Sequence, residues 1–234
     1  MDSLLCSDDD GIRLVTLNRP ERRNAMNSVL AIAFIDALRQ ADLDNTVRAM
    51  VIGGHGKSFC AGADLSEFSG EHADPAAQEK RSDLFLELQL LFDEIDVPII
   101  AAVEGPAIGM GASIAIAADL TVMGESGRLG FPEIAHGMLP SLVMGHLQHR
   151  TTRKHAFELL SLPASLPAAE ALSRGLVNRV VPDGTALAEA MEIARTLAGH
   201  DRTTMRRTKR LFLETCDMPL GAGLRAARDF ARKR

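Results

Sequence analysis

Two glycine-containing segments have the residue types that can present main-chain N–H groups to a ligand. One segment runs from Gly56 to Leu65 and the other from Glu104 to Ser113. Small residues in both let a ligand approach the backbone, and a helix is expected to begin near the end of each. Two such turns side by side can direct two donors at one oxygen and stabilise negative charge that develops there. Taken alone, either turn is more typical of a plain strand-to-helix connection.

Hydrophobic periodicity predicts strands that alternate with helices along most of the chain. Residues 13–18 alternate between apolar and polar types, which indicates a strand, and residues 28–41 carry apolar side chains at helical spacing. This alternation, without a break in composition, predicts a single α/β core followed by helices. The predicted strands are 13–18, 49–53, 99–103, 120–123 and 176–181, and the predicted helices are 28–41, 64–68, 84–95, 112–118, 141–160, 167–174, 185–198, 203–213 and 224–234.

Composition excludes several classes of protein. The formal net charge of -5 gives no global attraction to nucleic acid or to anionic lipid, and the absence of Trp and Tyr removes the best stacking platforms for bases. The three cysteines have no C-x-x-C spacing, so no disulfide framework and no metal site are expected. The longest weakly polar run, residues 107–118, is too short to span a bilayer, and the acidic start does not resemble a signal peptide. A cytoplasmic protein is therefore expected.

Motifs along nearly the whole chain resemble those of the crotonase (enoyl-CoA hydratase/isomerase) superfamily. They occur in the family's order and include both glycine-containing segments. The stretches that carry the resemblance are Leu17–Pro20 with Asn24–Asn27, Phe59–Leu65, Val103–Gly111, Gly130–Glu133 with Gly137–Pro140, and Ala171–Val181.

The resemblance implies a fold and a class of substrate. The fold is an α/β crotonase-like ββα spiral core, placed at residues 1–182, with a helical C-terminal region at 183–234 that belongs to the same structural unit and builds a homotrimer or a dimer of trimers. The substrate is an acyl-CoA thioester, with no cofactor beyond the CoA that it carries.

The resemblance also implies roles for the two turns. The backbone N–H groups of Ala63 and Met110 would form an oxyanion hole for the thioester carbonyl. Met110 stands where the family usually has the middle of three glycines. It keeps the N–H group but adds a side chain, which is expected to narrow the acyl pocket or to shift the turn.

Acid–base chemistry is where the sequence departs most from the family. Family hydratases use two glutamates; Glu133 occupies one of these positions, but Ser113 occupies the other. Glu133 alone can take and return a proton, as in family isomerases. Alternatively, Ser113 orients water while Glu133 acts as acid and base, as in hydratase-lyases, although those enzymes also use a tyrosine that this chain lacks. A third possibility is a catalytically weakened member that binds CoA or a protein partner.

Several further residues are candidates for holding CoA. Arg22 and Arg23 lie where the family binds the adenine and phosphates, but an arginine pair is equally compatible with a solvated surface. Asp64 is more typical of a helix cap. The complete set of candidates is Arg22, Arg23, Ala61, Asp64, Leu65, Phe230 and Lys233, the last two toward a neighbouring subunit's nucleotide.

Overall fold

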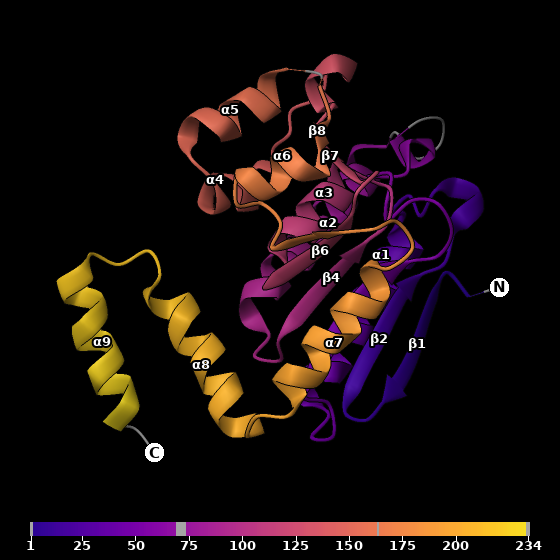
Figure 1. The fold of residues 1–234 in the computed structure, drawn as a ribbon. Coiled ribbons are helices and arrows are strands. Elements are labelled where there is room, and N and C mark those ends of the chain that lie inside the picture. The colour runs from indigo at the N-terminus through magenta and orange to yellow at the C-terminus, as the bar shows by residue number, and fades with distance from the viewer. Residues whose placement is uncertain (1, 69–73, 163, 233–234) are drawn as a thin grey trace.

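The computed structural model describes residues 2–68, 74–162 and 164–232, and within these residues it places two sheets (Figure 1). The larger sheet has the strand order β1-β2-β3-β4-β6-β9. Strands β1 and β2 pair antiparallel, and every later neighbour pairs parallel. The bounds are β1 Leu4–Asp9, β2 Ile12–Leu17, β3 Ala49–Gly54, β4 Ile99–Val103, β6 Leu120–Gly124 and β9 Arg179–Val181.

The smaller sheet holds the second glycine turn. Strand β5 (Pro106–Ile108) pairs parallel with β7 (Arg128–Gly130), and β7 pairs antiparallel with β8 (Leu166–Pro167). Strand β5 leads directly into α3 (Met110–Ala117), so the sheet fixes the place at which this helix begins.

Helices cover both faces of the larger sheet. Alternate residues of β3 separate into two apolar clusters, with Met50 and Ile52 facing the larger one. Helices α1 (Ser28–Leu43), α2 (Pro75–Glu94) and α3 contribute to that larger cluster. Helix α7 (Ala186–Ala198) covers the opposite face with alanines at every fourth position, which allow a close approach to the strands. The remaining helical elements are η1 Pro20–Arg22, η2 Leu65–Phe68, η4 Glu133–His136, α4 Met144–Arg150, α5 Arg153–Ser161, α6 Ala168–Ser173, α8 Arg202–Thr215 and α9 Leu220–Arg232.

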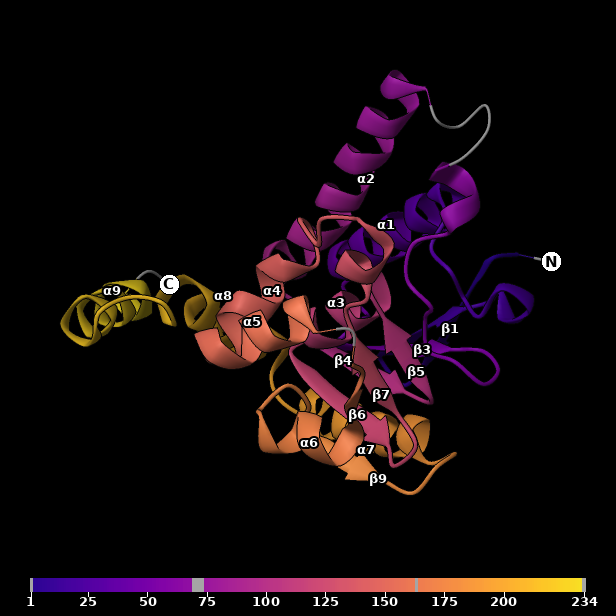
Figure 2. The ribbon, with the colours of Figure 1, turned by 90° about the horizontal axis from the view of Figure 1, so that it is seen from above.

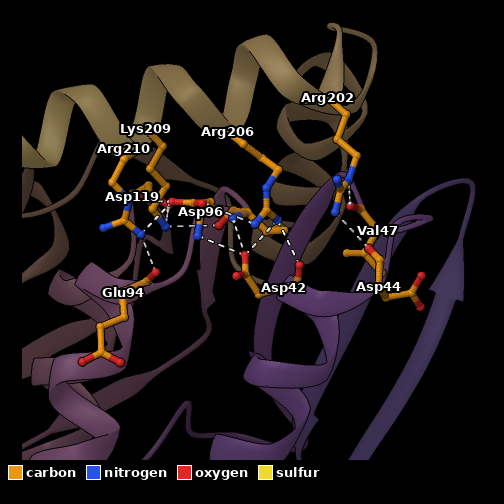
Figure 3. A network of polar contacts seen from close by, with 11 residues as sticks. Asp42, Asp44, Val47, Glu94, Asp96, Asp119, Arg202, Arg206, Lys209 and Arg210 are labelled. Carbon is orange, nitrogen blue, oxygen red and sulfur yellow. Dashed lines mark hydrogen bonds and ion pairs between the residues drawn. The ribbon is translucent and has the colours of Figure 1, made fainter. Parts of the chain in front are cut away.

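Helix α8 is attached to the core by a row of cations that face carboxylates and carbonyls (Figure 3). Lys209 is only 5% exposed, and its Nζ lies 2.7 Å from Asp119 Oδ2 and 3.1 Å from the carbonyl oxygen of Val97. Further contacts of the row join Arg202 to the carbonyls of Asp44 and Val47, Arg206 to Asp42 and Asp96, and Arg210 to Asp96, Asp93 and Glu94.

Helix α9 packs only lightly on the described part of the chain. It contacts α8 and has no buried residue, and it lies away from the sheets in both views (Figures 1 and 2). Leu220 and Leu224 are among its exposed apolar side chains.

The predicted elements are observed with shifted ends, and the three short strands of the smaller sheet, β5, β7 and β8, were not predicted. Strand β1 was not predicted, because five of its six residues are exposed and so carry no alternating pattern. Helix α2 begins at Pro75, capped by the Asp74 side chain, well before the apolar stripe that predicted it. The helix expected over 141–160 is divided into α4 and α5, because Thr152 caps a new helix. None of the described helices is long and apolar enough to cross a membrane.

Candidate active site

The two glycine turns lie side by side. Cys60 and Ala107 form a parallel bridge, and the N–H group of Ile108 donates to the carbonyl of Cys60 at 2.9 Å. Gly62 and Gly109 meet so closely that a Cβ built on Gly62 would lie 2.9 Å from the carbonyl oxygen of Ile108. A Cβ built on Gly109 would lie 3.8 Å from the Cα of Gly62. The structure therefore brings together the ends of the two turns that were predicted to supply the donors.

Both predicted donors have free N–H groups. No hydrogen bond from the N–H of Ala63 or of Met110 is found within the described residues. Met110 is the first residue of α3, where intrahelical acceptors are absent, and Gly109 reaches this helix start with a φ of 51°. Ala63 lies beside Met26, whose backbone pairs with Gly62 and Asp64 and leaves the Ala63 N–H unused. Both residues line the same cavity.

Glu133 adds a carboxylate to this place. A Cβ built on Gly109 would lie 2.7 Å from Oε1 of Glu133, so the side chain lies against the second turn. Its Oε2 is buried and has no hydrogen-bond partner within the described chain. Burial raises the pKa of Glu133 above its usual value, with smaller opposing effects from its own backbone and from His136. A carboxylate of this kind is a stronger base than an exposed one and is free to bond a ligand.

The cavity between these groups has a volume of about 840 Å³. This is the size of pockets that hold small ligands. Its walls are largely apolar, with charged side chains at a few points. Within the described chain the lining comprises Arg23, Ala61, Gly62, Ala63, Leu65, Phe68, Pro75, Gln78, Glu79, Arg81, Ser82, Phe85, Ile108, Gly109, Met110, Pro132, Glu133, His136, Met138, Leu139, Pro140, Ser141, Leu142 and Val143.

Ser113 lies outside the cavity lining. It is completely buried, and its hydroxyl donates to Oε1 of Gln89 at 2.6 Å. The amide nitrogen of Gln89 in turn donates to the sulfur of Met110 at 2.7 Å. The side chain of Met110 is therefore held by Gln89, and the same amide group accepts from the Ser113 hydroxyl.

The other carboxylates near the first turn have structural partners. Asp64 pairs with Arg19 at 3.0 Å and accepts from the Ser66 hydroxyl at 2.7 Å. Although burial opposes it, these contacts hold the pKa of Asp64 below its usual value. Glu67 accepts from the N–H and hydroxyl of Ser28 at the start of α1. Neither acid belongs to the cavity lining.

Only some of the candidate CoA-binding residues line the cavity. Arg23, Ala61 and Leu65 line the cavity, and Arg23 is exposed to solvent. Arg22 is exposed but is not part of the lining. Phe230 is on α9, where the guanidinium of Arg207 lies 5.0 Å from its ring. Lys233 lies outside the described residues.

Cys60 is unsuited to act as a nucleophile. Complete burial raises the pKa of its thiol to about 11, so the thiolate is scarce at neutral pH. Across the described chain no group of three or more metal-ligating side chains was found.

Sequence reasoning missed Arg81 and Gln89. Both project from α2 and are buried, at 6% and 5% exposure. Arg81 precedes Phe85, Leu88 and Phe92 at helical spacing, so the signal was a charged residue in line with an apolar stripe.

The sequence and the fold are both similar to those of known enoyl-CoA hydratases. The sequence model of the enoyl-CoA hydratase/isomerase family matches residues 7–233. The 2,3-dehydroadipyl-CoA hydratase of Escherichia coli is 32% identical over 225 residues, covering 96% of this chain and 87% of that protein. A candidate enoyl-CoA hydratase of Thermus thermophilus is 39% identical over 219 residues, covering 92% and 86%. The crystal structure of an enoyl-CoA hydratase from Mycobacterium smegmatis superposes with a TM-score of 0.92 at 29% identity, covering 98% of this chain and 89% of that one.

The fold and the sequence together define a crotonase-type α/β protein. The chain belongs to the enoyl-CoA hydratase/isomerase family of enzymes.

Proposed function

We propose that this enzyme moves the double bond of an enoyl-CoA thioester, with Glu133 as the only proton carrier. The observation that carries the proposal is a half-buried carboxylate beside two N–H groups in one cavity, where the buried oxygen Oε2 and both N–H groups have no hydrogen-bond partner among the described residues. The position at which family hydratases have their other glutamate is Ser113, whose hydroxyl is engaged by Gln89.

The proposed reaction has two proton transfers. With a 3-enoyl thioester in the cavity, the carboxylate of Glu133 takes a proton from C2, and the electron pair moves to the thioester oxygen. The N–H groups of Ala63 and Met110 donate to that oxygen and stabilise the enolate. The protonated Glu133 then gives the proton to C4, which yields the 2-enoyl thioester. No water enters or leaves, so one carboxylate is sufficient.

Hydration of a 2-enoyl-CoA is the second candidate. It is favoured by the names of the relatives, which include enoyl-CoA and 2,3-dehydroadipyl-CoA hydratases. In that case Glu133 would both activate water and protonate C2.

Product analysis distinguishes the two reactions. The enzyme is incubated separately with 3-enoyl-CoA and 2-enoyl-CoA thioesters of four to ten carbons in H₂¹⁸O, and products are identified by liquid chromatography and mass spectrometry. Isomerisation predicts products of unchanged mass. Hydration adds one labelled water to the 2-enoyl thioester. If this heavier product forms faster than the isomerised product, hydration is the main activity.

We also propose that the CoA part of the substrate lies against Arg23, Ala61 and Leu65 at the mouth of the cavity. The chain is further proposed to form a homotrimer or a dimer of trimers, and to act in the cytoplasm. The basis for oligomerisation is α9, on which Leu220 and Leu224 are exposed within the described chain. Arg22 and Phe230 would then reach CoA only at its solvent-facing end or across a subunit boundary. Light scattering tests the assembly.

A further inference from the structure

Arg81 is a buried cation in the wall of the cavity, and no anionic partner for it is found among residues 2–68, 74–162 and 164–232. Its residue exposure is 6%, and its Nη2 has no hydrogen-bond partner in the part of the chain that the structure describes. In the described part of the chain no carboxylate forms an ion pair with it. Burying a guanidinium without a counter-ion is unfavourable, so the position is costly unless a ligand supplies the missing acceptors.

The guanidinium is held in place by an aromatic ring. Its central carbon lies 4.3 Å from the centre of the Phe68 ring, and Phe68 also lines the cavity. Stacking of this kind uses the face of the guanidinium and leaves the N–H donors in its plane for another partner. Phe68 ends η2, the short helix that follows the first glycine turn. The ring therefore links the orientation of Arg81 to the element beside the predicted donor at Ala63.

The surroundings of Arg81 suit the far end of an acyl chain. Phe85, Leu142 and Val143 line the same cavity and are apolar. Two carboxylates are found in the described lining, on Glu79 and Glu133. Glu79 is exposed on α2, and Glu133 lies against Gly109. An acyl chain in this cavity thus meets apolar walls and an unpaired cation.

We propose that Arg81 binds a free carboxylate on the acyl chain, so that the preferred substrates are CoA thioesters of dicarboxylic acids. The inference rests on the proposed function, in which the cavity accepts an acyl-CoA. The forked donors of arginine match a carboxylate in two parallel hydrogen bonds. The thioester carbonyl would be held at Ala63 and Met110, and the second acid group would lie at Arg81.

Calorimetric titration with saturated thioesters tests this without turnover. The dicarboxylic series is glutaryl-, adipyl- and pimelyl-CoA, and the matched series is pentanoyl-, hexanoyl- and heptanoyl-CoA. For at least one length the dicarboxylic thioester should bind wild-type enzyme at least tenfold more tightly, as expected for a charge-assisted hydrogen bond. A smaller preference at all three lengths would overturn the proposal.

Variants show whether Arg81 is the cause. In Arg81→Met the ratio of the two affinities should fall to about 1, and in Arg81→Lys it should be intermediate. The control Lys80→Met, at the adjacent exposed position of α2, should keep the wild-type ratio. If Arg81→Met instead weakens both series equally, Arg81 contacts the CoA moiety or supports packing, and the proposal is wrong.

The two proposals fail in distinguishable ways. Tight binding of a dicarboxylic thioester with no turnover of any enoyl-CoA would support the role of Arg81 and contradict the proposed reaction. Turnover of enoyl-CoA, without a tenfold preference for binding dicarboxylic over monocarboxylic thioesters, would support the proposed reaction and contradict the role of Arg81.

Discussion

Replacement of Glu133 by Gln tests the proton transfer most directly. The substitution keeps the volume of the side chain and its position beside Gly109 but removes the base. A positioned acid–base group contributes about 10² to 10⁴ in rate. Because Oε2 of Glu133 is buried and no second acid from α3 reaches the cavity lining, we expect the loss in kcat to lie at the upper end of this range.

Stability separates this loss from misfolding. The pKa of Glu133 is raised by burial, so the folded state favours its protonated form. The stabilisation from that proton is present below the unfolded-state pKa and is lost as pH rises through the higher folded-state pKa. A neutral Gln carries no such loss. At pH 7.5 the melting temperature of Glu133→Gln should therefore equal or exceed that of the wild type.

The assay follows conversion of 3-enoyl-CoA and thermal unfolding, with Glu125→Gln as the control at an exposed position outside the cavity lining. In the wild type, kcat/KM should rise with pH with a midpoint above the usual glutamate value of about 4.3. The reasoning is refuted if Glu133→Gln keeps more than a tenth of the wild-type rate. A loss of similar size in Glu79→Gln would show that the cavity uses a second carboxylate.

Three further substitutions test other parts of the site and fold. In Gly109→Ala the new Cβ would lie 2.7 Å from Oε1 of Glu133, at a residue whose φ is +51°. We therefore expect kcat/KM to fall by about 10² or more, because the substitution displaces the carboxylate or the turn. Wild-type kinetics would contradict the described contact. Ser113→Ala leaves a buried amide oxygen unsatisfied, so urea unfolding should show a loss of about 1–3 kcal/mol with kcat within threefold of wild type; a 10²-fold loss in kcat would indicate a catalytic serine. Lys209→Met leaves the Asp119 carboxylate, whose side chain is 25% exposed, without its cation. At fixed protein concentration we expect the free energy of unfolding to fall by roughly 2–4 kcal/mol. An unchanged free energy of unfolding would show that α8 is held mainly by apolar contacts.

Periodic patterns predicted much of the fold, but not the features that depend on tertiary contacts. The strands at 49–54 and 99–103 are buried and could be predicted from their apolar runs. Strand β1 depends on pairing with β2 rather than on a pattern of its own. The proximity of Gly62 and Gly109 is likewise a property of two chain segments, which spacing along one sequence does not contain.

The candidate site was predicted in part. The motif resemblance identified Ala63, Met110 and Glu133, and all three line one cavity. It also identified Ser113, whose surroundings depend on Gln89, a residue of another helix. Arg81 was missed because periodicity assigns residues to a buried face without saying whether a buried charge is paired.

The two proposed donors belong to the main chain, and this has a consequence for how such a protein diverges. Changes of side chain at 63 or 110 leave the two amide hydrogens where they are, whereas the neighbouring glycines leave no room for substitution. Methionine at 110 illustrates the tolerance. Mutations of the side chains that line the cavity can thus change which substrates bind. The two main-chain donors stay in place, so substrate specificity can change while the reaction chemistry is kept.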